Sequence, residues 1–480
     1  MNYFLSSLLK DSAMFYKLNK YTFVRNINNY LVIVDKRTEN ELIGDYTSYL
    51  FVRHLKHEAQ DIDIIIRNVC AEFSGKVDFS LVKNDGISLF NRLSEFGLVS
   101  KADNTNSFIN EDKEILNDIP RILLPKEELD KFKETRNKNP TLQSIIVEIT
   151  KKCNERCIHC YIPHEDKTVM MSDEDFYRIV EQAKEMQTVV NFRISGGECM
   201  THPSFKKFIK YVKENGFALD LLTNLTLLDD ETIEILKNGT FSSVQTTLFS
   251  LKPEIHDRIT TVPGSLEKTL KNLEKLNKAK IKVAIATQAM EMNKDSIDDL
   301  YRYCNSHGFN LRCDWTIIAK ENRDENNLSC RICNLSDYKE ICKLKLRYID
   351  GYKNELKEEL SRPPKPETTH LCNAGTNGLQ IDTNLNVHPC PGWDLSLGNL
   401  KNETLSDIWM KSEKLQKVRD VILRDFPKCA KCEIRNLCSI CMAQADLEMN
   451  SSNFKFEMPK YVCEMYKVIY DTIKEEVLEK

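Results

Sequence analysis

Residues 144–161 read SIIVEITKKCNERCIHCY, and this stretch decides how the rest of the chain is interpreted. Its apolar first part, Ser144–Ile149, has the composition of a buried strand. Three cysteines follow with the spacing CxxxCxxC, and thiolates this close together can face one iron–sulfur cluster while one iron stays open to another ligand. A zinc knuckle with His159 as fourth ligand is the alternative, but zinc sites usually show paired cysteines or Cys/His sets. The spacing favours an iron–sulfur cluster. The three cysteines are Cys153, Cys157 and Cys160.

The bulk composition is that of a globular protein. The chain has 480 residues, of which 41% are hydrophobic and 29% charged, so we expect two to four domains. A net charge of −4 gives no electrostatic reason to expect nucleic acid or an anionic membrane as a partner. The N-terminal FLSSLL stretch, residues 4–9, ends at Lys10 and is too short for a signal peptide or a membrane helix. We therefore expect a cytoplasmic protein, whose 17 cysteines indicate metal or redox chemistry rather than disulfides.

Strand-like and helix-like runs alternate between residues 141 and 325. Six such repeats predict a parallel sheet with right-handed crossovers. Ligands bind at the carboxyl ends of parallel strands, where the three cysteines, Gly196-Gly197-Glu198 and Thr223-Asn224 would meet. The predicted strands are Ser144–Ile149, Val189–Ser195, Ala218–Thr223, Ser243–Leu248, Lys282–Gln288 and Asn310–Trp315. The predicted helices include Asp173–Met186, Phe205–Asn215, Glu231–Leu236 and Leu266–Lys278.

The cysteine spacing, the repeats and the Gly196-Gly197-Glu198 turn together resemble the radical S-adenosylmethionine (radical SAM) superfamily. The resemblance implies an α/β fold with a partial (β/α)6 barrel over residues 141–325. It implies that the three cysteines hold a [4Fe–4S] cluster, whose open iron chelates SAM and which splits it to a 5′-deoxyadenosyl radical. The Gly196-Gly197 backbone and the Glu198 carboxylate would receive the SAM ammonium, and His159 would lie near the adenine. The SAM contacts so implied are His159, Gly196, Gly197, Glu198, Thr223, Asn224 and Thr247, and Asn293 is a further candidate.

Seven cysteines lie in residues 366–480, and two zinc ribbons are one interpretation of them. Their pattern resembles the SPASM domain, which binds two auxiliary [4Fe–4S] clusters. The sequence departs from that family at Leu385, where the family has glycine, and in having two residues rather than three between Cys438 and Cys441. Both departures bear on the loop geometry. By the resemblance, the outer cluster is held by Cys429, Cys432, Cys438 and Cys463, and the inner one by Cys372, Cys390 and Cys441.

Residues 326–365 form a bridging segment between these two regions. The inner cluster has only three assigned ligands. It is left either with an open site, to which a substrate thiolate could bind, or with a fourth ligand from the bridging segment. The candidates for that ligand are Cys330, Cys333 and Cys342.

Residues 1–105 are predicted to form a small α/β module, followed by a linker over residues 106–140 with a helix at Lys126–Thr135. The order of strands and helices is typical of a winged helix. DNA binding is disfavoured because residues 1–100 hold seven lysines and five arginines against twelve acidic residues. The strands are Tyr21–Arg25, Tyr30–Asp35 and Asn40–Gly44, and the helices are Thr47–Leu55, Ile62–Phe73 and Ile87–Glu95, the last ended by Gly97.

The same order of elements resembles the RiPP recognition element of enzymes that modify ribosomally made peptides. That resemblance implies capture of a leader peptide as an added strand on the edge of the sheet. A stabilising extension is the alternative interpretation.

Taken together, the resemblances imply a radical SAM/SPASM peptide maturase similar to sactipeptide and ranthipeptide synthases. It would join a cysteine sulfur to carbon in a leader-bearing precursor peptide, with reduction by a donor such as flavodoxin or ferredoxin. Other outcomes on this scaffold are C–C or C–O crosslinks, epimerisation with Cys199 or Cys313 as hydrogen donor, and sulfatase-maturase-type oxidation of cysteine or serine. The non-enzymatic alternative is a metal-binding winged-helix regulator.

Overall fold

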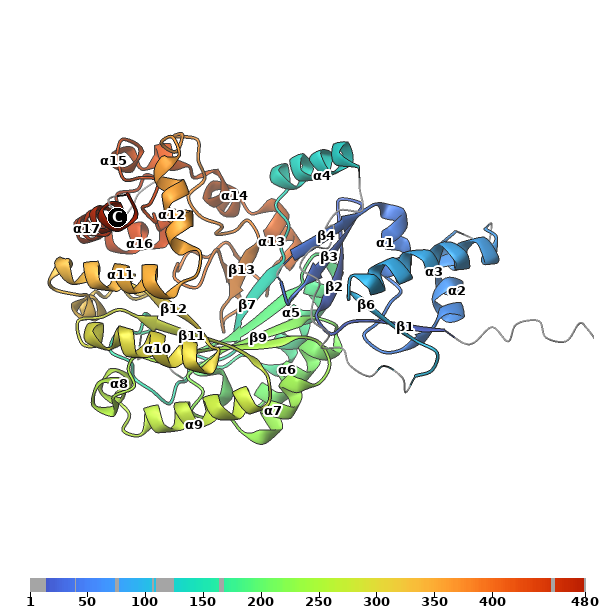
Figure 1. Cartoon of the computed structure of the whole chain (residues 1–480), viewed down its shortest axis with the longest axis horizontal. Helices are drawn as coiled ribbons and strands as arrows, with labels where there is room; N and C mark the ends of the chain where they lie inside the picture. The colour runs from blue at the N-terminus through green and yellow to red at the C-terminus, as the bar shows by residue number, and fades with distance from the viewer. Residues whose placement is uncertain are drawn as a thin grey trace, which may run out of the picture.

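One long sheet is shared by the middle and the C-terminal parts of the chain (Figure 1). The N-terminal module lies beyond the amino ends of its strands. In this computed structural model, residues 14–478 are described apart from 39, 74–76, 106–107, 109–124, 164–167 and 450–453. The N-terminal FLSSLL stretch and most of the first half of the predicted linker lie outside the described residues. Among the residues described, no helix combines the length and the apolar character needed to cross a membrane.

The predicted partial barrel is confirmed. Its six strands are mutually parallel and lie side by side in chain order, as right-handed βα units require. Each begins and ends within two residues of its predicted bounds, because each is a short run in which buried residues recur and which turn or helix residues close on both sides. The strands are β7 (Ser144–Glu148), β8 (Asn191–Ser195), β9 (Ala218–Thr223), β10 (Ser242–Thr247), β11 (Lys282–Gln288) and β12 (Asn310–Asp314).

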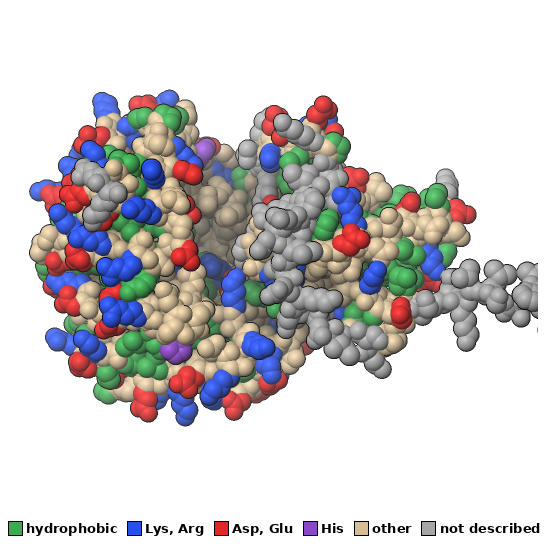
Figure 2. Space-filling model, in the orientation of Figure 1, with side chains coloured by type: hydrophobic (Ala, Val, Ile, Leu, Met, Phe, Trp, Pro, Cys, Tyr) green, Lys and Arg blue, Asp and Glu red, His purple; other side chains and the backbone are tan. Residues whose placement is uncertain are grey.

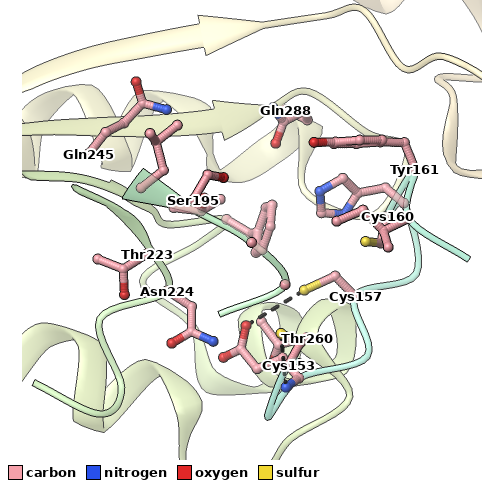
Figure 3. Close-up of a pocket in the computed structure, with 18 of the residues that line it drawn as sticks. Cys153, Cys157, Cys160, Tyr161, Ser195, Thr223, Asn224, Gln245, Thr260 and Gln288 are labelled. Carbon is pink, nitrogen blue, oxygen red and sulfur yellow. Dashed lines mark hydrogen bonds between the residues drawn. The ribbon is translucent and has the colours of Figure 1, made fainter. Parts of the chain in front are cut away.

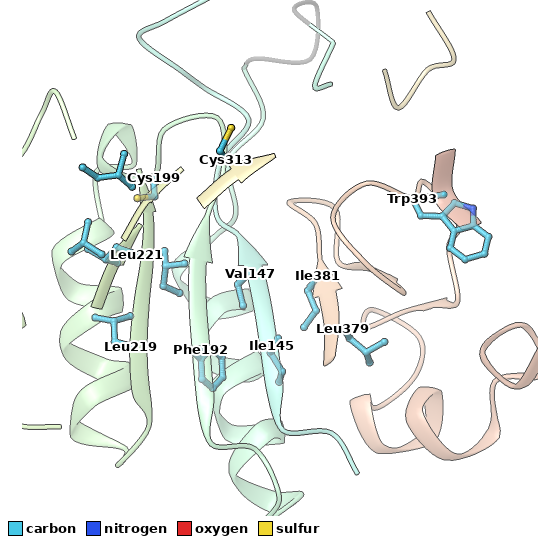
Figure 4. Packing of buried hydrophobic residues seen from close by; sticks show 14 of the residues in the cluster. Ile145, Val147, Phe192, Cys199, Leu219, Leu221, Cys313, Leu379, Ile381 and Trp393 are labelled. Carbon is cyan, nitrogen blue, oxygen red and sulfur yellow. The ribbon is translucent and has the colours of Figure 1, made fainter. Parts of the chain in front are cut away.

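Helices cover the outer face of these strands. Alternate residues such as Phe192 and Ile194 of β8 are fully buried against them (Figure 4). The start of the first helix shows why it forms there: the Ser172 hydroxyl accepts a hydrogen bond from Asp175 N, and acidic residues in the first turn suit the helix dipole. The helices are α5 (Asp173–Glu185), α6 (Phe205–Glu214), α7 (Asp230–Lys237), α8 (Pro253–Thr260), α9 (Ser265–Lys278) and α10 (Ile297–His307).

The C-terminal domain continues the barrel sheet. Strand β13 (Gly378–Ile381) pairs in parallel with β7, with Leu379 opposite Ile145, so one hydrophobic core spans both domains (Figure 4). Beyond it follow β14 (Asn386–His388) and β15 (Gly398–Asn399). Its helices, with those of the bridging segment, are α11 (Tyr338–Tyr348), α12 (Tyr352–Ser361), α13 (Leu405–Lys411), α14 (Glu413–Asp420), α15 (Pro427–Ala430), α16 (Met442–Met449) and α17 (Lys460–Leu478).

Leu385 adopts the backbone conformation that glycine would have in the turn between β13 and β14. Its φ is +70°, which is unfavourable for a side-chain-bearing residue. Its side chain is fully buried in the common core, so hydrophobic burial offsets this strain. The departure from the family pattern therefore leaves the left-handed turn in place.

The N-terminal module contains the predicted strands and helices. They are β2 (Thr22–Ile27), β3 (Tyr30–Asp35), β4 (Asn40–Gly44), α1 (Tyr46–Val52), α2 (Ile62–Glu72) and α3 (Phe79–Glu95). Gly97 has φ +66° just after α3, as expected of a helix end. A second sheet was not predicted; it consists of β1 (Phe15–Leu18), β5 (Gln60–Asp61) and β6 (Val99–Ala102).

Helix α3 begins eight residues before its predicted start. The sequence Asn84-Asp85-Gly86 is typical of a turn, but here it lies inside the helix. A methyl group on Gly86 would lie 2.6 Å from Ile66 Cδ1, so the glycine lets α3 pack closely on α2. Tertiary packing therefore overrides the local turn preference.

The module lies against the amino ends of the barrel strands. Phe23 of β2 packs with Val190, Ala218 and Phe241, which precede or begin β8, β9 and β10. Helix α4 (Lys126–Lys138) covers one face of the module's sheet through Leu129 and Phe132. The module is therefore at the end of the barrel opposite the ligand-binding loops.

Candidate functional site

A pocket of about 290 Å³ opens where the barrel strands end (Figure 3). It is bordered by the cysteine loop, which we define as residues 150–161 after β7, and by the residues that end β8 to β11. Half-buried cysteines and uncharged polar side chains make up much of its wall. The residues that line it include Cys153, Glu155, Cys157, His159, Cys160, Tyr161, Ser195, Gly196, Gly197, Thr223, Asn224, Gln245, Thr247, Phe249, His256 and Gln288.

The three predicted cysteines converge at this pocket. Burial raises the pKa of the Cys157 thiol well above its ordinary value, and the neighbouring Glu155 carboxyl and the Cys160 and Cys153 thiols raise it further. The loop is held in place by α8, because Arg156 N and Ile158 N donate to carbonyls of that helix at 3.1 and 3.0 Å. A protonated thiol is a poor metal ligand, so iron binding would have to displace these protons.

The Gly196-Gly197 turn is packed against the cysteine loop. A methyl group on Gly197 would lie 2.6 Å from the carbonyl oxygens of both Lys151 and Lys152. The backbone N–H groups of Gly197 and Glu198 are already used by that loop, each donating at 2.8 Å to Thr150 O or Lys152 O. The glycines are thus required first for close approach of two loops.

The direct contact predicted between the Glu198 carboxylate and the SAM ammonium stays a prediction. The Glu198 carboxylate is fully buried and does not line the pocket. It accepts hydrogen bonds from Thr223 Oγ1 at 2.7 and 2.9 Å and from Asn224 N at 2.7 Å. Burial raises its pKa, while hydrogen bonds, including that from Met200 N, oppose the rise. Glu198 positions Thr223 and Asn224, and those two residues reach the pocket in its place.

His159 and Thr247 line the pocket as predicted. Burial lowers the pKa of His159 to about 4, so its ring is neutral near pH 7. The ring packs edge-on against Phe249 with centroids 4.9 Å apart, and its buried Nδ1 has no hydrogen-bond partner among the described residues. Asn293, the further candidate, is instead fully buried and braces the loop after β11 by donating to Phe249 O and Gln288 O.

His256 has a packing role. Its Nδ1 accepts from Phe249 N at 3.2 Å, and burial lowers its pKa to about 4. The adjacent Asp257 accepts from Gly264 N and Leu266 N at the start of α9. Both residues hold the loops that surround the pocket.

The seven C-terminal cysteines form two groups. In the inner thiol set (Cys372, Cys390, Cys441), burial raises the pKa of Cys390 to about 12, with Cys441 and Cys372 contributing. In the outer thiol set (Cys429, Cys432, Cys438, Cys463), burial raises the pKa of Cys438 to about 12, with the other three thiols contributing. The resemblance to SPASM proteins had grouped them in the same way.

The three bridging cysteines are not brought to the inner set. Cys342 is buried inside α11, and Cys330 packs beside Phe249 and the cysteine loop. Cys333 is exposed, and its N–H donates to Glu291. Burial raises the pKa of two further thiols, those of Cys199 and Cys313, which pack in the core and do not line the pocket.

The segment around Cys330 fastens the barrel to the C-terminal domain. The Asn327 amide donates to His159 O at 3.3 Å. Arg331 forms an ion pair with Glu448 of α16 at 2.6 Å, and their side chains are only 11% and 4% exposed. Glu448 lies seven residues after Cys441, so this buried pair links the pocket side of the barrel to the helix that follows an inner-set cysteine.

Tyr161 is a pocket residue that sequence reasoning missed. Its phenol is buried, which raises its pKa well above the ordinary value, with added effects from Glu148, Glu321, Cys160 and Cys390. Cys160 belongs to the cysteine loop and Cys390 to the inner thiol set, so the Tyr161 phenol lies within electrostatic range of both. Its position directly after the third cysteine was the available signal.

The donor set and the shape suit a cluster with SAM. Three thiols meet at one mouth, and the Gly197 Cα contributes no side chain to the wall beside them. The buried Nδ1 of His159 has no hydrogen-bond partner among the described residues, and the Thr247 side chain also lines the pocket. Among the residues described, no three His, Cys, Asp or Glu side chains are placed to hold a single metal ion.

Two family models match the chain. The radical SAM superfamily model matches residues 147–304, which contain the cysteine loop and the pocket turns. A model for an iron–sulfur cluster-binding domain, SPASM, matches residues 372–433, which contain cysteines of both C-terminal sets.

The individual proteins that the chain resembles have low sequence identity with it. An AdoMet-dependent heme synthase of Methanosarcina barkeri is 25% identical over 325 residues, 62% of this chain and 90% of that protein. The antilisterial bacteriocin subtilosin biosynthesis protein AlbA of Bacillus subtilis is 24% identical over 316 residues, 64% of this chain and 68% of that protein. The structure of Streptococcus suis SuiB bound to precursor peptide SuiA matches with a TM-score of 0.60 at 16% identity, over 93% of this chain and 99% of that one.

At that identity the SuiB match shows the fold alone, while the two family models fall on the barrel and on the C-terminal thiols. Sequence models and architecture agree: the chain carries a radical SAM domain over the barrel and a SPASM iron–sulfur domain at its C-terminal end, and it is an enzyme whose cofactors are [4Fe–4S] clusters and SAM.

Proposed function

We propose that this enzyme modifies a leader-bearing ribosomal peptide by joining a cysteine sulfur to carbon. The observation that carries the proposal is the position of Tyr161. It lines the pocket directly after Cys160, and its phenol lies within electrostatic range of Cys390 in the three-member inner set, so a peptide in the pocket would approach both thiol sets. An inner cluster with three protein ligands has room for the sulfur of a substrate cysteine.

The chain's own residues bind and orient, and the cofactors carry the radical chemistry. Cys153, Cys157 and Cys160 would hold the first cluster, and when bound with SAM it supplies the radical that removes a hydrogen atom from the peptide. Asn224 and the Gly196-Gly197 backbone would border SAM on one side. Neutral His159 would border it on the other without adding charge.

The N-terminal module would hold the leader. Strand β4 pairs with β3 alone among the described residues, so its other edge can accept an added peptide strand. The module lies at the opposite end of the barrel from the pocket. A leader held there tethers the core peptide and raises its effective concentration at the pocket to about the mM range.

The heme synthase relatives favour a second candidate, a tetrapyrrole substrate. A haem-like product carries carboxylates, and buried carboxylates are usually paired with Arg or Lys. The described lining of the pocket contains neither. The pocket therefore favours an uncharged substrate group. Figure 2 shows a hollow beside the C-terminal domain, which lies on the left of the view, with charges of both signs along that side.

The test is anaerobic reconstitution followed by mass spectrometry of a precursor peptide encoded beside the gene. We expect each modified peptide to lose a pair of hydrogen atoms and one alkylatable thiol. A Cys390→Ala variant should lose this product while the cysteine loop still binds iron. SAM cleavage with an unaltered peptide mass and a free thiol would sink the thioether; a lost pair of hydrogens with the thiol still free would indicate another crosslink.

A further inference from the structure

Two glutamines line the pocket. Gln245 lies on β10 and Gln288 ends the neighbouring strand β11. Both side chains are half-buried, and neither carboxamide has a hydrogen-bond partner among the described residues. Polar groups in such a setting normally find a partner, in the protein, in water or in a ligand. These two amides therefore stand ready for a ligand.

Strand geometry aims these residues into the barrel. Thr246 and Thr287, next to them in sequence, are almost fully buried on the outer face, so the glutamines take the inner one. Valine or leucine in their place would fill the barrel with apolar side chains, as in a closed (β/α)8 barrel. Paired carboxamides at this level indicate recognition rather than packing.

The two amides lie apart from most of the residues expected to border SAM, although Thr247 follows Gln245 two positions later on β10 and also lines the pocket. In Figure 3, Gln245, Gln288 and Tyr161 lie along the upper part of the pocket, while Thr223, Asn224 and the Cys157 thiol lie below them. The pocket is thus divided between a cofactor side and a side with uncharged hydrogen-bonding groups. The second side is where a substrate would be placed against SAM.

The chemistry of this side selects a neutral ligand. No lysine or arginine is among the described lining residues, and the one carboxylate there, Glu155, is occupied by a hydrogen bond from Ser265. A carboxamide offers an N–H donor and a C=O acceptor, which match the C=O and N–H of a peptide group. Phosphate or carboxylate ligands would find no counter-charge.

We propose that Gln245 and Gln288 bind backbone amides of the core peptide and hold it extended across the pocket. The inference rests on the proposed function and names the two residues that recognise the core rather than the leader. Lying on adjacent parallel strands, they would contact neighbouring stretches of one peptide. They contact its backbone, so recognition would tolerate changes in its side chains.

The experiment compares two fluorescent peptides, the leader alone and the leader with its core, binding to the reconstituted enzyme with SAM. In the wild-type enzyme we expect the longer peptide to bind more tightly. In Gln245→Met and Gln288→Met, which keep the side-chain length, this advantage should fall about fivefold for each lost hydrogen bond. Binding of the leader alone should stay within about twofold, as should SAM affinity measured by equilibrium dialysis. Gln416→Met, the same change on the exposed surface of α14, is the matched control.

Two results would overturn the inference. If SAM affinity falls in step with peptide affinity, the two amides serve the cofactor. If the core's contribution is unchanged in both variants, they bind nothing on the substrate. A wild-type enzyme that binds no leader-bearing peptide refutes the proposed function itself, and so is distinguishable from failure of this inference.

Discussion

Replacing Gly197 with alanine tests the packing of the glycine turn on the cysteine loop. The added methyl group would lie 2.6 Å from the carbonyl oxygens of Lys151 and Lys152, whereas ordinary contact begins near 3.4 Å, so the loop must retreat by about 0.8 Å. Overpacking of this kind costs about 1–3 kcal/mol of stability. A displacement near 1 Å at a reacting centre costs about a hundredfold in rate. We expect Gly197→Ala to cleave SAM about a hundredfold more slowly than the wild-type enzyme.

The assay is reductive SAM cleavage without peptide, with iron and sulfide measured on the same sample. Gly216→Ala is the control, because Gly216 has φ +75° but nothing within 4 Å of the added methyl group. It should lose about 1–2 kcal/mol from backbone strain and cleave SAM normally. Wild-type cleavage by Gly197→Ala, at full iron content, would refute the argument that the two loops touch through this glycine.

Three further predictions concern stability, measured by chemical denaturation of the protein without its clusters. Leu385→Gly should lose about 1–4 kcal/mol, because the buried side chain is worth more than the relief of its left-handed backbone; a gain in stability would contradict this ranking. Arg331→Met should lose about 3–5 kcal/mol by leaving Glu448 buried and unpaired, and the double variant with Glu448→Leu should recover most of it; a double variant as unstable as the single would show that packing, not charge, matters here. Burial lowers the pKa of His256 to about 4 from 6.5, so the unfolded chain binds the extra proton first and stability is lost as pH falls from 6.5 to 4. The loss should be about 3 kcal/mol and should shrink in His256→Gln, because glutamine has no proton to bind in this pH range; an equal loss in the variant would show that another group causes it.

The barrel could be predicted from the sequence because its signals are local. Each strand is a short run with recurring apolar or buried positions, and the order of strands and helices fixes a parallel sheet. The second sheet of the N-terminal module could not, because Phe15–Leu18 is a short segment that becomes a strand only by pairing with Val99–Ala102, far along the chain. The early start of α3 has a similar cause, since Gly86 is tolerated there only because another helix packs against it.

The sequence predicts which residue types form the site, but not where their side chains point. Spacing brings Cys153, Cys157 and Cys160 to one mouth, because they follow a single strand. Spacing does not say where a carboxylate points, and Glu198 turns inward to Thr223 and Asn224. Gln288, the last residue of its strand, would have been found by asking which strand positions face inward.

The pairing of β13 with β7 decides whether the barrel can be produced without the C-terminal domain. Strand β7 leads directly into the cysteine loop, and one of its edges is covered by a strand from the far end of the chain. A chain truncated before Gly378 would leave the backbone groups of that edge bare, and bare edges recruit other chains into aggregates. The C-terminal domain therefore cannot be removed without exposing an edge of the barrel sheet. It completes the barrel, and the barrel expressed alone should be insoluble before its radical chemistry can be asked about.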